Sequence, residues 1–230
     1  MSKRSLGDRM KRYEKVTSDK LMPRMPTLIR IDGKAFHTYV KKMGFVFPFD
    51  NDLHQLMTET ALGLSHSVQN AQLCYYQSDE ISILLTDWAT FQTDQWFGGN
   101  IQKIASVSAS IATTEFIRGM VGLDYNLNHL PLFDARVWQL PKEEVNNYFL
   151  WRQQDASRNS IQMLGRSHFS HNQMQGKIQK DIHDMLNKID VNWNNLETWK
   201  RRGTCIRLGE YDSQIPLFNE DKNYIEDLLI

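Results

Sequence analysis

The order in which strand-like and helix-like periodicities follow one another is the feature that most constrains this chain. Within the first 140 residues, two short segments alternate apolar and polar residues as strands do, and two more are short runs of β-prone residues. Two longer segments repeat apolar residues at helical spacing. Strands are expected over Thr27–Asp32, Ala71–Tyr76, Ile81–Leu85 and Phe133–Trp138, and helices over residues 53–64, with Asp50 or Asn51 as the cap, and 101–116. The predicted series is therefore β-α-β-β-α-β.

A β-α-β-β-α-β series closes most simply as an antiparallel, ferredoxin-like sheet with both helices on one face. In that topology the first strand lies beside the third. The C-terminal end of the first strand then reaches the same sheet edge as the turn between the second and third strands. The predicted fold class is α+β.

The rest of the chain is predicted to be mainly helical. An amphipathic helix is expected over residues 5–16, and Pro141 begins a helical pattern that runs to about residue 165. Ser170 starts a capping box for a further helix to Lys188, and the pattern at residues 204–208 is compatible with an edge strand. No linker composition separates these parts, so we expect one compact domain over residues 1–230, with a core of about 1–140 and a helical extension of about 141–230.

Composition and charge exclude several classes of protein. The longest apolar runs, such as Ile81–Leu85, fall far short of the roughly 20 residues that a membrane helix needs. The basic segment at residues 1–12 leads into no apolar run, so we expect a cytoplasmic protein without a membrane anchor, in which Cys74 and Cys205 stay thiols. Lys and Arg number 27 against 27 Asp and Glu, so a polyanionic partner would have to meet a local basic patch.

Three carboxylates are expected to meet at one edge of the predicted sheet. Asp32 ends the first strand, and Asp79 and Glu80 lie in the turn between the second and third. Taken alone, each of these residues is also common in turns or at strand ends for structural reasons. Together they would repel one another and raise their own pKa values unless cations lay between them, and such hard oxygen ligands suit Mg²⁺. Gly33, next to Asp32, lets backbone N–H groups approach an anion, so the Asp32–Asp79 pair is predicted to be catalytic.

Several blocks of the sequence resemble one known family, the tRNA-His guanylyltransferases and their relatives that polymerise RNA in the 3′ to 5′ direction. The similarity covers most of the chain and implies a polymerase-like palm, in agreement with the predicted order of elements. The matching blocks are Gly7–Lys11, Arg30–His37, Tyr76–Glu80, Phe133–Val137, Trp151–Asp155 and Arg202–Thr204.

The resemblance implies a metal site and a nucleotide site. Asp32, the Gly33 carbonyl and Asp79 would bind two Mg²⁺ ions, with Glu80 as a supporting catalytic residue. ATP and GTP or another NTP would be the substrates. The nucleotide-binding residues would be Asp32, Gly33, Lys34, Ala35, Phe36, His37, Ser78, Asp79 and Lys103.

The implied chemistry has two stages. A tRNA with a 5′-monophosphate is activated, typically by adenylylation from ATP, and the 3′-hydroxyl of an incoming NTP then attacks the activated phosphate. The resemblance also implies a homotetramer built from dimers. Contacts to the tRNA or its phosphates are expected from Arg136 and Arg152, which the resemblance indicates, from Asn159, and from the cation-rich C-terminal half with Lys177, Arg201 and Arg202.

One departure from the family bears on substrate choice. Enzymes that add the extra guanosine to tRNA-His carry a His-Ile-Asn-Asn stretch where this chain has Ser157–Ser160, and only Asn159 matches. This departure resembles the subgroup that restores missing 5′ nucleotides by copying the opposite strand of the acceptor stem. Guanosine addition to tRNA-His and a palm-fold nucleotidyl cyclase stay as alternatives. An RNA-recognition module is rejected, because Leu28–Ile31 and Ile81–Leu85 carry no aromatic residue for stacking.

Overall fold

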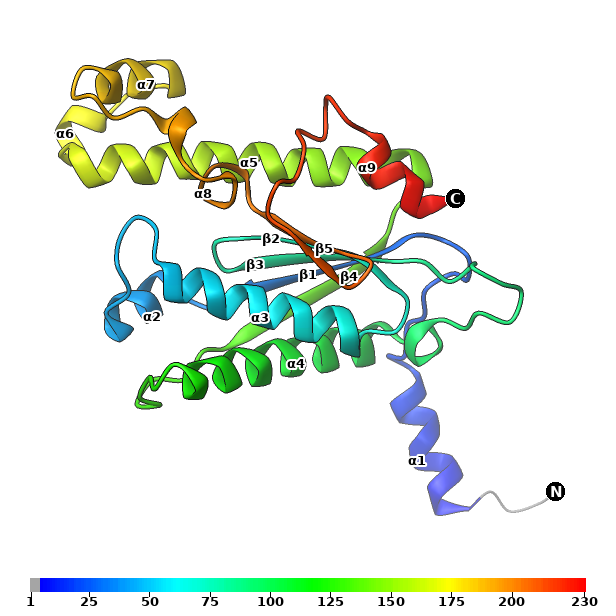
Figure 1. Ribbon diagram of the computed structural model, residues 1–230. Helices are drawn as coiled ribbons and strands as arrows, with labels where there is room; N and C mark the ends of the chain where they lie inside the picture. The colour runs from blue at the N-terminus through cyan, green and yellow to red at the C-terminus, as the bar shows by residue number, and fades with distance from the viewer. Residues whose placement is uncertain (1–4) are drawn as a thin grey trace.

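Six strands form one antiparallel sheet in the computed structural model, which describes residues 5–230 (Figure 1). The spatial order is β4-β1-β3-β2-β5-β6, so β1 lies between β3 and β4 as the predicted topology requires. The predicted α+β fold and its series of strands are confirmed. The strands are β1 (Thr27–Gly33), β2 (Ala71–Gln77), β3 (Glu80–Leu85), β4 (Phe133–Gln139), β5 (Thr204–Arg207) and β6 (Glu210–Asp212).

Helices cover both faces of the sheet. The two predicted crossover helices, α3 (Asn51–Ser67) and α4 (Ile101–Gly122), lie on one face, and the long helix α5 (Lys142–His168) crosses the other (Figure 1). Asp50 caps α3 by accepting a hydrogen bond from the Leu53 backbone N–H. The remaining helices are α1 (Leu6–Lys15), α2 (Phe36–Met43), α6 (His171–Met174), α7 (Gln179–Asn187), α8 (Thr198–Arg202) and α9 (Asn223–Glu226), with 3₁₀ turns at Trp96–Gly99, Trp193–Asn195 and Asp227–Leu229.

The strand alternation divides the core into two layers. Ile29 and Ile31 pack with α3 and α4, whereas Leu28 packs with α5 and the C-terminal residues. Both layers exclude water, so each face of the central strands is apolar except near the end of β1. Cys74 and Cys205 lie in different layers as buried free thiols.

The C-terminal part departs from the prediction in two places. The helix expected from Ser170 to Lys188 is interrupted, because Gly176 adopts a φ of +73° between α6 and α7. The segment expected as an edge strand is β5, and β6 follows it and forms the edge. The extension is therefore not purely helical, since it adds two strands to the sheet.

The N-terminal helix stands away from the rest of the chain. α1 begins at the Ser5 cap as predicted, buries none of its residues, and projects from the end of the sheet opposite α2 (Figure 1). Within residues 5–230, no helix is long and apolar enough to cross a membrane.

Candidate active site

The end of β1 brings Asp32 beside the turn that joins β2 and β3. Asp32 is the register partner of Glu80, and the Gly33 backbone N–H donates a 3.2 Å hydrogen bond to the Asp79 carbonyl. Asp32 and Asp79, which are 47 positions apart in the sequence, therefore meet at one sheet edge. This is the juxtaposition that the order of elements predicts.

Gly33 is required where it stands because no side chain fits there. A Cβ at this position would lie 2.4 Å from the Phe36 ring and 3.0 Å from the Asp79 carboxylate. The main chain of Gly33 therefore passes directly against a candidate metal ligand. The Gly33 carbonyl is the third candidate oxygen for a cation held by the two aspartates.

The pKa of the Asp79 carboxyl group is higher than that of an ordinary aspartate. Burial, and then the charge of Asp32, raise its pKa to about 6, although Ser78 donates a 3.0 Å hydrogen bond to it. A cation between Asp32 and Asp79 would remove this electrostatic cost. No group of three or more His, Cys, Asp or Glu side chains within residues 5–230 forms a complete metal cage. Two carboxylates and a carbonyl nevertheless fit Mg²⁺, which keeps waters and uses substrate phosphates for its remaining positions.

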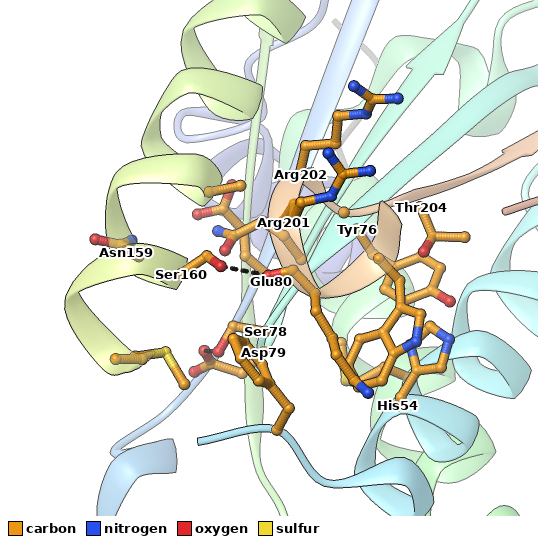
Figure 2. Close-up of a pocket in the computed structure, with 18 of the residues that line it drawn as sticks. His54, Tyr76, Ser78, Asp79, Glu80, Asn159, Ser160, Arg201, Arg202 and Thr204 are labelled. Atoms are coloured by element: carbon orange, nitrogen blue, oxygen red, sulfur yellow. Dashed lines mark hydrogen bonds between the residues drawn. The ribbon is translucent and has the colours of Figure 1, made fainter. Parts of the chain in front are cut away.

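A pocket of about 520 Å³ opens beside the acidic pair, between the sheet edge, α3, α5 and α8 (Figure 2). In Figure 2, Ser78 and Asp79 lie between a side formed by Asn159 and Ser160 and a side formed by His54 and Tyr76. Of the residues predicted from the sequence, the pocket lining includes Asp32, Ser78, Asp79, Glu80, Arg152, Asn159, Arg201 and Arg202.

Glu80 and Arg152 form an ion pair behind the acidic pair. Arg152 Nε and Nη2 donate to the two Glu80 oxygens at 2.6 and 2.7 Å, and Arg30 Nη2 contacts Glu80 at 2.6 Å. Arg152 also reaches Asp155 at 3.0 Å. Its side chain is 4% exposed, so its donors face carboxylates and not a phosphate. The expectation that Arg152 contacts phosphate is not supported, because its charge is already balanced inside the protein.

The predicted nucleotide segment after Asp32 lies outside the pocket and forms the start of α2. Lys34, Ala35 and His37 are exposed, and Ala35 has a φ of +52° where the strand turns into the helix. Phe36 is buried in the core layer with α3 and α4, so its ring cannot contact a nucleotide. Only its backbone N–H, in the first turn of α2, stays a candidate donor.

Lys103, another predicted nucleotide contact, lies far from the acidic pair. It lies in the first turn of α4, and the Lys103 ammonium is 5.2 Å from the centre of the Phe97 ring. The other end of this helix leads to β4, whose first residue pairs with Gly33. A 22-residue helix is about 30 Å long, so Lys103 is far from Asp32 within the same chain.

Two predicted RNA contacts lie on the surface outside the pocket lining. Arg136 is exposed on the outer strand β4, opposite Arg30. Lys177 is exposed between α6 and α7. Neither lines the pocket, and both stay candidates for contact with a longer RNA.

The stretch that departs from the family is used to hold α5 in place. Arg158 donates a 2.9 Å hydrogen bond to Asp155, and the Ser160 hydroxyl donates to the Lys200 carbonyl while accepting from Trp193. Asn159 is exposed at the pocket rim. Its side-chain amide also donates a 3.4 Å hydrogen bond to Asp155, so three of these four residues make contacts within the chain.

Sequence reasoning missed His54, Trp199 and Arg30 as residues of the pocket. The His54 and Trp199 rings stack with centroids 4.0 Å apart and planes 8° apart. They come from α3 and α8, and no local pattern connects positions so far apart. Arg30 was visible as an alternating polar residue of the first strand and as the first residue of one matching block, but no role was assigned to it.

Comparison with known proteins agrees with this geometry. A bacterial tRNA(His) guanylyltransferase-like protein in complex with ATP superposes with a TM-score of 0.93 at 46% identity, covering 98% of this chain and 99% of that one. A bacterial tRNA(His) guanylyltransferase-like protein in complex with GTP gives a TM-score of 0.86 at 42% identity, with coverage of 98% and 99%. The tRNA(His) guanylyltransferase of Schizosaccharomyces pombe is 29% identical over 86% of this chain and 78% of its own length.

The match to a family model is equally direct. The model described as tRNAHis guanylyltransferase matches residues 7–141, which is more than half of the chain and contains β1 to β4 with both aspartates. The chain therefore belongs to the tRNAHis guanylyltransferase family of nucleotidyltransferases.

Proposed function

We propose that this enzyme adds nucleotides in the 3′ to 5′ direction to the 5′ end of truncated tRNA, copying the opposite strand of the acceptor stem. The observation that carries the proposal is the acidic pair Asp32 and Asp79, which opens onto a pocket that also contains Arg201 and Arg202. Within residues 5–230, neither arginine forms an ion pair. A site with acidic and basic parts suits metal-dependent transfer between phosphorylated substrates.

Asp32, Asp79 and the Gly33 carbonyl would hold Mg²⁺. Bound Mg²⁺ supplies positive charge that neutralises a triphosphate and lowers the pKa of an attacking hydroxyl. Lys34 and the N–H groups at the start of α2 would face the triphosphate of an NTP. Arg201 and Arg202 would contact phosphates of the RNA from the α8 side of the pocket.

Two displacements at phosphorus make up the proposed reaction. In the first, an oxygen of the tRNA 5′-monophosphate attacks the α-phosphorus of ATP, and pyrophosphate leaves. In the second, the 3′-oxygen of an incoming NTP attacks the 5′-phosphorus of the activated RNA, and AMP leaves. Each step forms one P–O bond and breaks one, so no protein nucleophile is needed.

Templated addition is favoured over recognition of tRNA-His by the stretch at residues 157–160. Arg158 and Ser160 are engaged with other parts of this chain, so few of its side chains are free to read RNA. The similarity at 42 to 46% identity to bacterial guanylyltransferase-like proteins supports the same subgroup. Base pairing would then select the nucleotide.

The deciding measurement compares two RNA substrates under Mg²⁺, ATP and labelled NTP. We expect a higher kcat/KM for a tRNA that lacks its first 5′ nucleotide than for guanosine addition to full-length tRNA-His. The opposite preference would assign the enzyme to guanosine addition, and a labelled cyclic nucleotide would indicate a cyclase.

Asp32→Asn should lower the rate of nucleotide transfer by about a hundredfold or more, whereas Glu143→Gln, an exposed control on α5, should not lower it. The homotetramer that the resemblance implies would be tested by sedimentation velocity.

A further inference from the structure

The acidic pair has candidate substrate positions on two sides. Asp32, Ser78 and Asp79 line the pocket, whereas residues 34–37 lie outside it at the start of α2. A reaction that joins two nucleotides must hold both of them against the same catalytic group. If the proposed function is correct, the segment at residues 34–37 accounts for one nucleotide, and the pocket is available for the other.

His54 and Trp199 give this pocket an aromatic wall. Besides its stack with Trp199, the His54 ring lies 5.9 Å from the Tyr76 ring, and Trp199 meets Phe49 edge to face at 6.1 Å. Packing against the rings of Trp199 on α8 and Tyr76 on β2 fixes the orientation of the imidazole. His54 and Tyr76 lie on one side of the pocket in Figure 2.

The ring nitrogens of His54 are free to bind a ligand. Within residues 5–230, neither nitrogen makes a hydrogen bond, and the side chain lines the pocket. Burial, helped by the charge of Lys200, lowers the pKa of His54 to about 4 even though Glu197 opposes this shift. At neutral pH the imidazole therefore offers one donor and one acceptor in a fixed position, as a group that pairs with a nucleobase edge does.

Arg201 and Arg202 indicate that the ligand is an anion. They are adjacent in the chain, both line the pocket, and the Nε atom of each is buried without a hydrogen-bond partner. Burial and the charge of Arg201 lower the pKa of Arg202. The charge of Glu220 opposes this shift, but within residues 5–230 it forms no ion pair with either arginine, so a bound phosphate group would stabilise the two adjacent like charges.

We infer that this pocket binds a nucleoside 5′-phosphate, with His54 hydrogen-bonded to its base and Arg201 and Arg202 beside its phosphates. The volume of about 520 Å³ is within the range of small-ligand pockets. The same chemistry is present in the terminal nucleotide of a tRNA and in a free NTP. The assay therefore measures the two separately.

The test replaces His54 by Phe, which keeps an aromatic ring against Trp199 and removes both ring nitrogens. His66→Phe is the matched control, since His66 is an exposed histidine on the same helix and does not line the pocket. We expect His54→Phe to raise the KM for truncated tRNA or for the NTP by about three- to tenfold, with kcat and Tm near those of wild type.

The two KM values identify the source of the nucleotide. A rise in the KM for tRNA alone places the RNA terminus in the pocket, and a rise in the KM for NTP alone places the incoming nucleotide there. If both KM values match the His66→Phe control, His54 does not bind a nucleotide and the inference is wrong, whatever the change in Tm. If wild-type protein transfers no label, the proposed function fails. In that case, calorimetric titration of each protein with GTP and with a 5′-phosphorylated acceptor-stem RNA replaces the kinetic assay. If His54→Phe binds each of these ligands with the same affinity as the His66→Phe control, the inference is wrong.

Discussion

Arg152→Met distinguishes a buried ion pair from a substrate contact. Arg152 and Glu80 have side chains that are 4% and 5% exposed, and two hydrogen bonds of 2.6 and 2.7 Å join them. Methionine preserves most of the volume of the side chain and removes its charge. Glu80 would then be left as a buried carboxylate with one fewer counter-charge.

The expected loss follows from the cost of an uncompensated buried charge. Removing one partner of such a pair costs about 3 to 5 kcal/mol. Arg30 stays 2.6 Å from Glu80, with a side chain that is 24% exposed, so the lower end of the range applies. A loss of about 3 kcal/mol corresponds to a fall in Tm of about 6 to 12 °C for a chain of this length.

Urea denaturation of four proteins would test this reasoning. Glu80→Gln in the Arg152→Met background should recover at least half of the lost free energy of unfolding, because a neutral amide needs no counter-charge. Arg158→Met, on the same helix with a side chain that is 56% exposed, should change the free energy by less than about 1 kcal/mol. If Arg152→Met unfolds within about 1 kcal/mol of wild type and instead raises the KM for tRNA, Arg152 contacts the substrate and the ion-pair reasoning is refuted.

Three further predictions concern the pocket. Because the folded-state pKa of His54 is about 4, below its ordinary 6.5, the unfolded chain takes up a proton first as pH falls. The free energy of unfolding should therefore fall between about pH 6.5 and 4, by about 1 to 2 kcal/mol once the solvent in the open pocket is considered, and denaturation of His54→Phe should show a smaller fall. Replacing Arg201 and Arg202 by Gln should flatten the dependence of log tRNA affinity on log salt concentration by about 1 to 2 units, as measured by filter binding. Gly203→Ala should lower Tm sharply in a thermal melt, because Gly203 has a φ of +85° and its Cβ would lie 2.6 Å from the Tyr76 carbonyl.

The sheet and the acidic pair were predictable because local patterns and general topology determine them. The alternation in β1 and the hairpin of β2 and β3 are each visible within one short segment of sequence, and handedness then places Asp32 beside Asp79. The interruption at Gly176 was missed because a glycine inside a helical pattern is compatible with either continuation or termination.

Residue roles that depend on distant partners were not predictable. Arg152 carries the same charge whether it faces a phosphate or Glu80, and only the packing of α5 against β3 decides between them. The place of the Phe36 ring was hidden in the same way, since the ring fills the space that Gly33 leaves empty and only the backbone N–H stays a candidate for the nucleotide. His54 gains its role from Trp199, which lies 145 positions later in the chain, so no pattern within α3 could reveal it.

The register of β5 explains why the C-terminal residues belong to the catalytic architecture. Thr204 pairs with Tyr76 on β2, the strand that leads into the turn with Asp79. Gly203 allows the main chain to pass against the Tyr76 carbonyl, and Arg201 and Arg202 end the short helix immediately before it. The two arginines directly precede β5, and Asp79 directly follows β2, so the pairing of these neighbouring strands fixes the separation of the cations and the carboxylate more firmly than a flexible extension would. Loss of β5 would expose the edge of β2 and displace both arginines, so phosphate binding and the stability of the acidic turn are expected to be lost together.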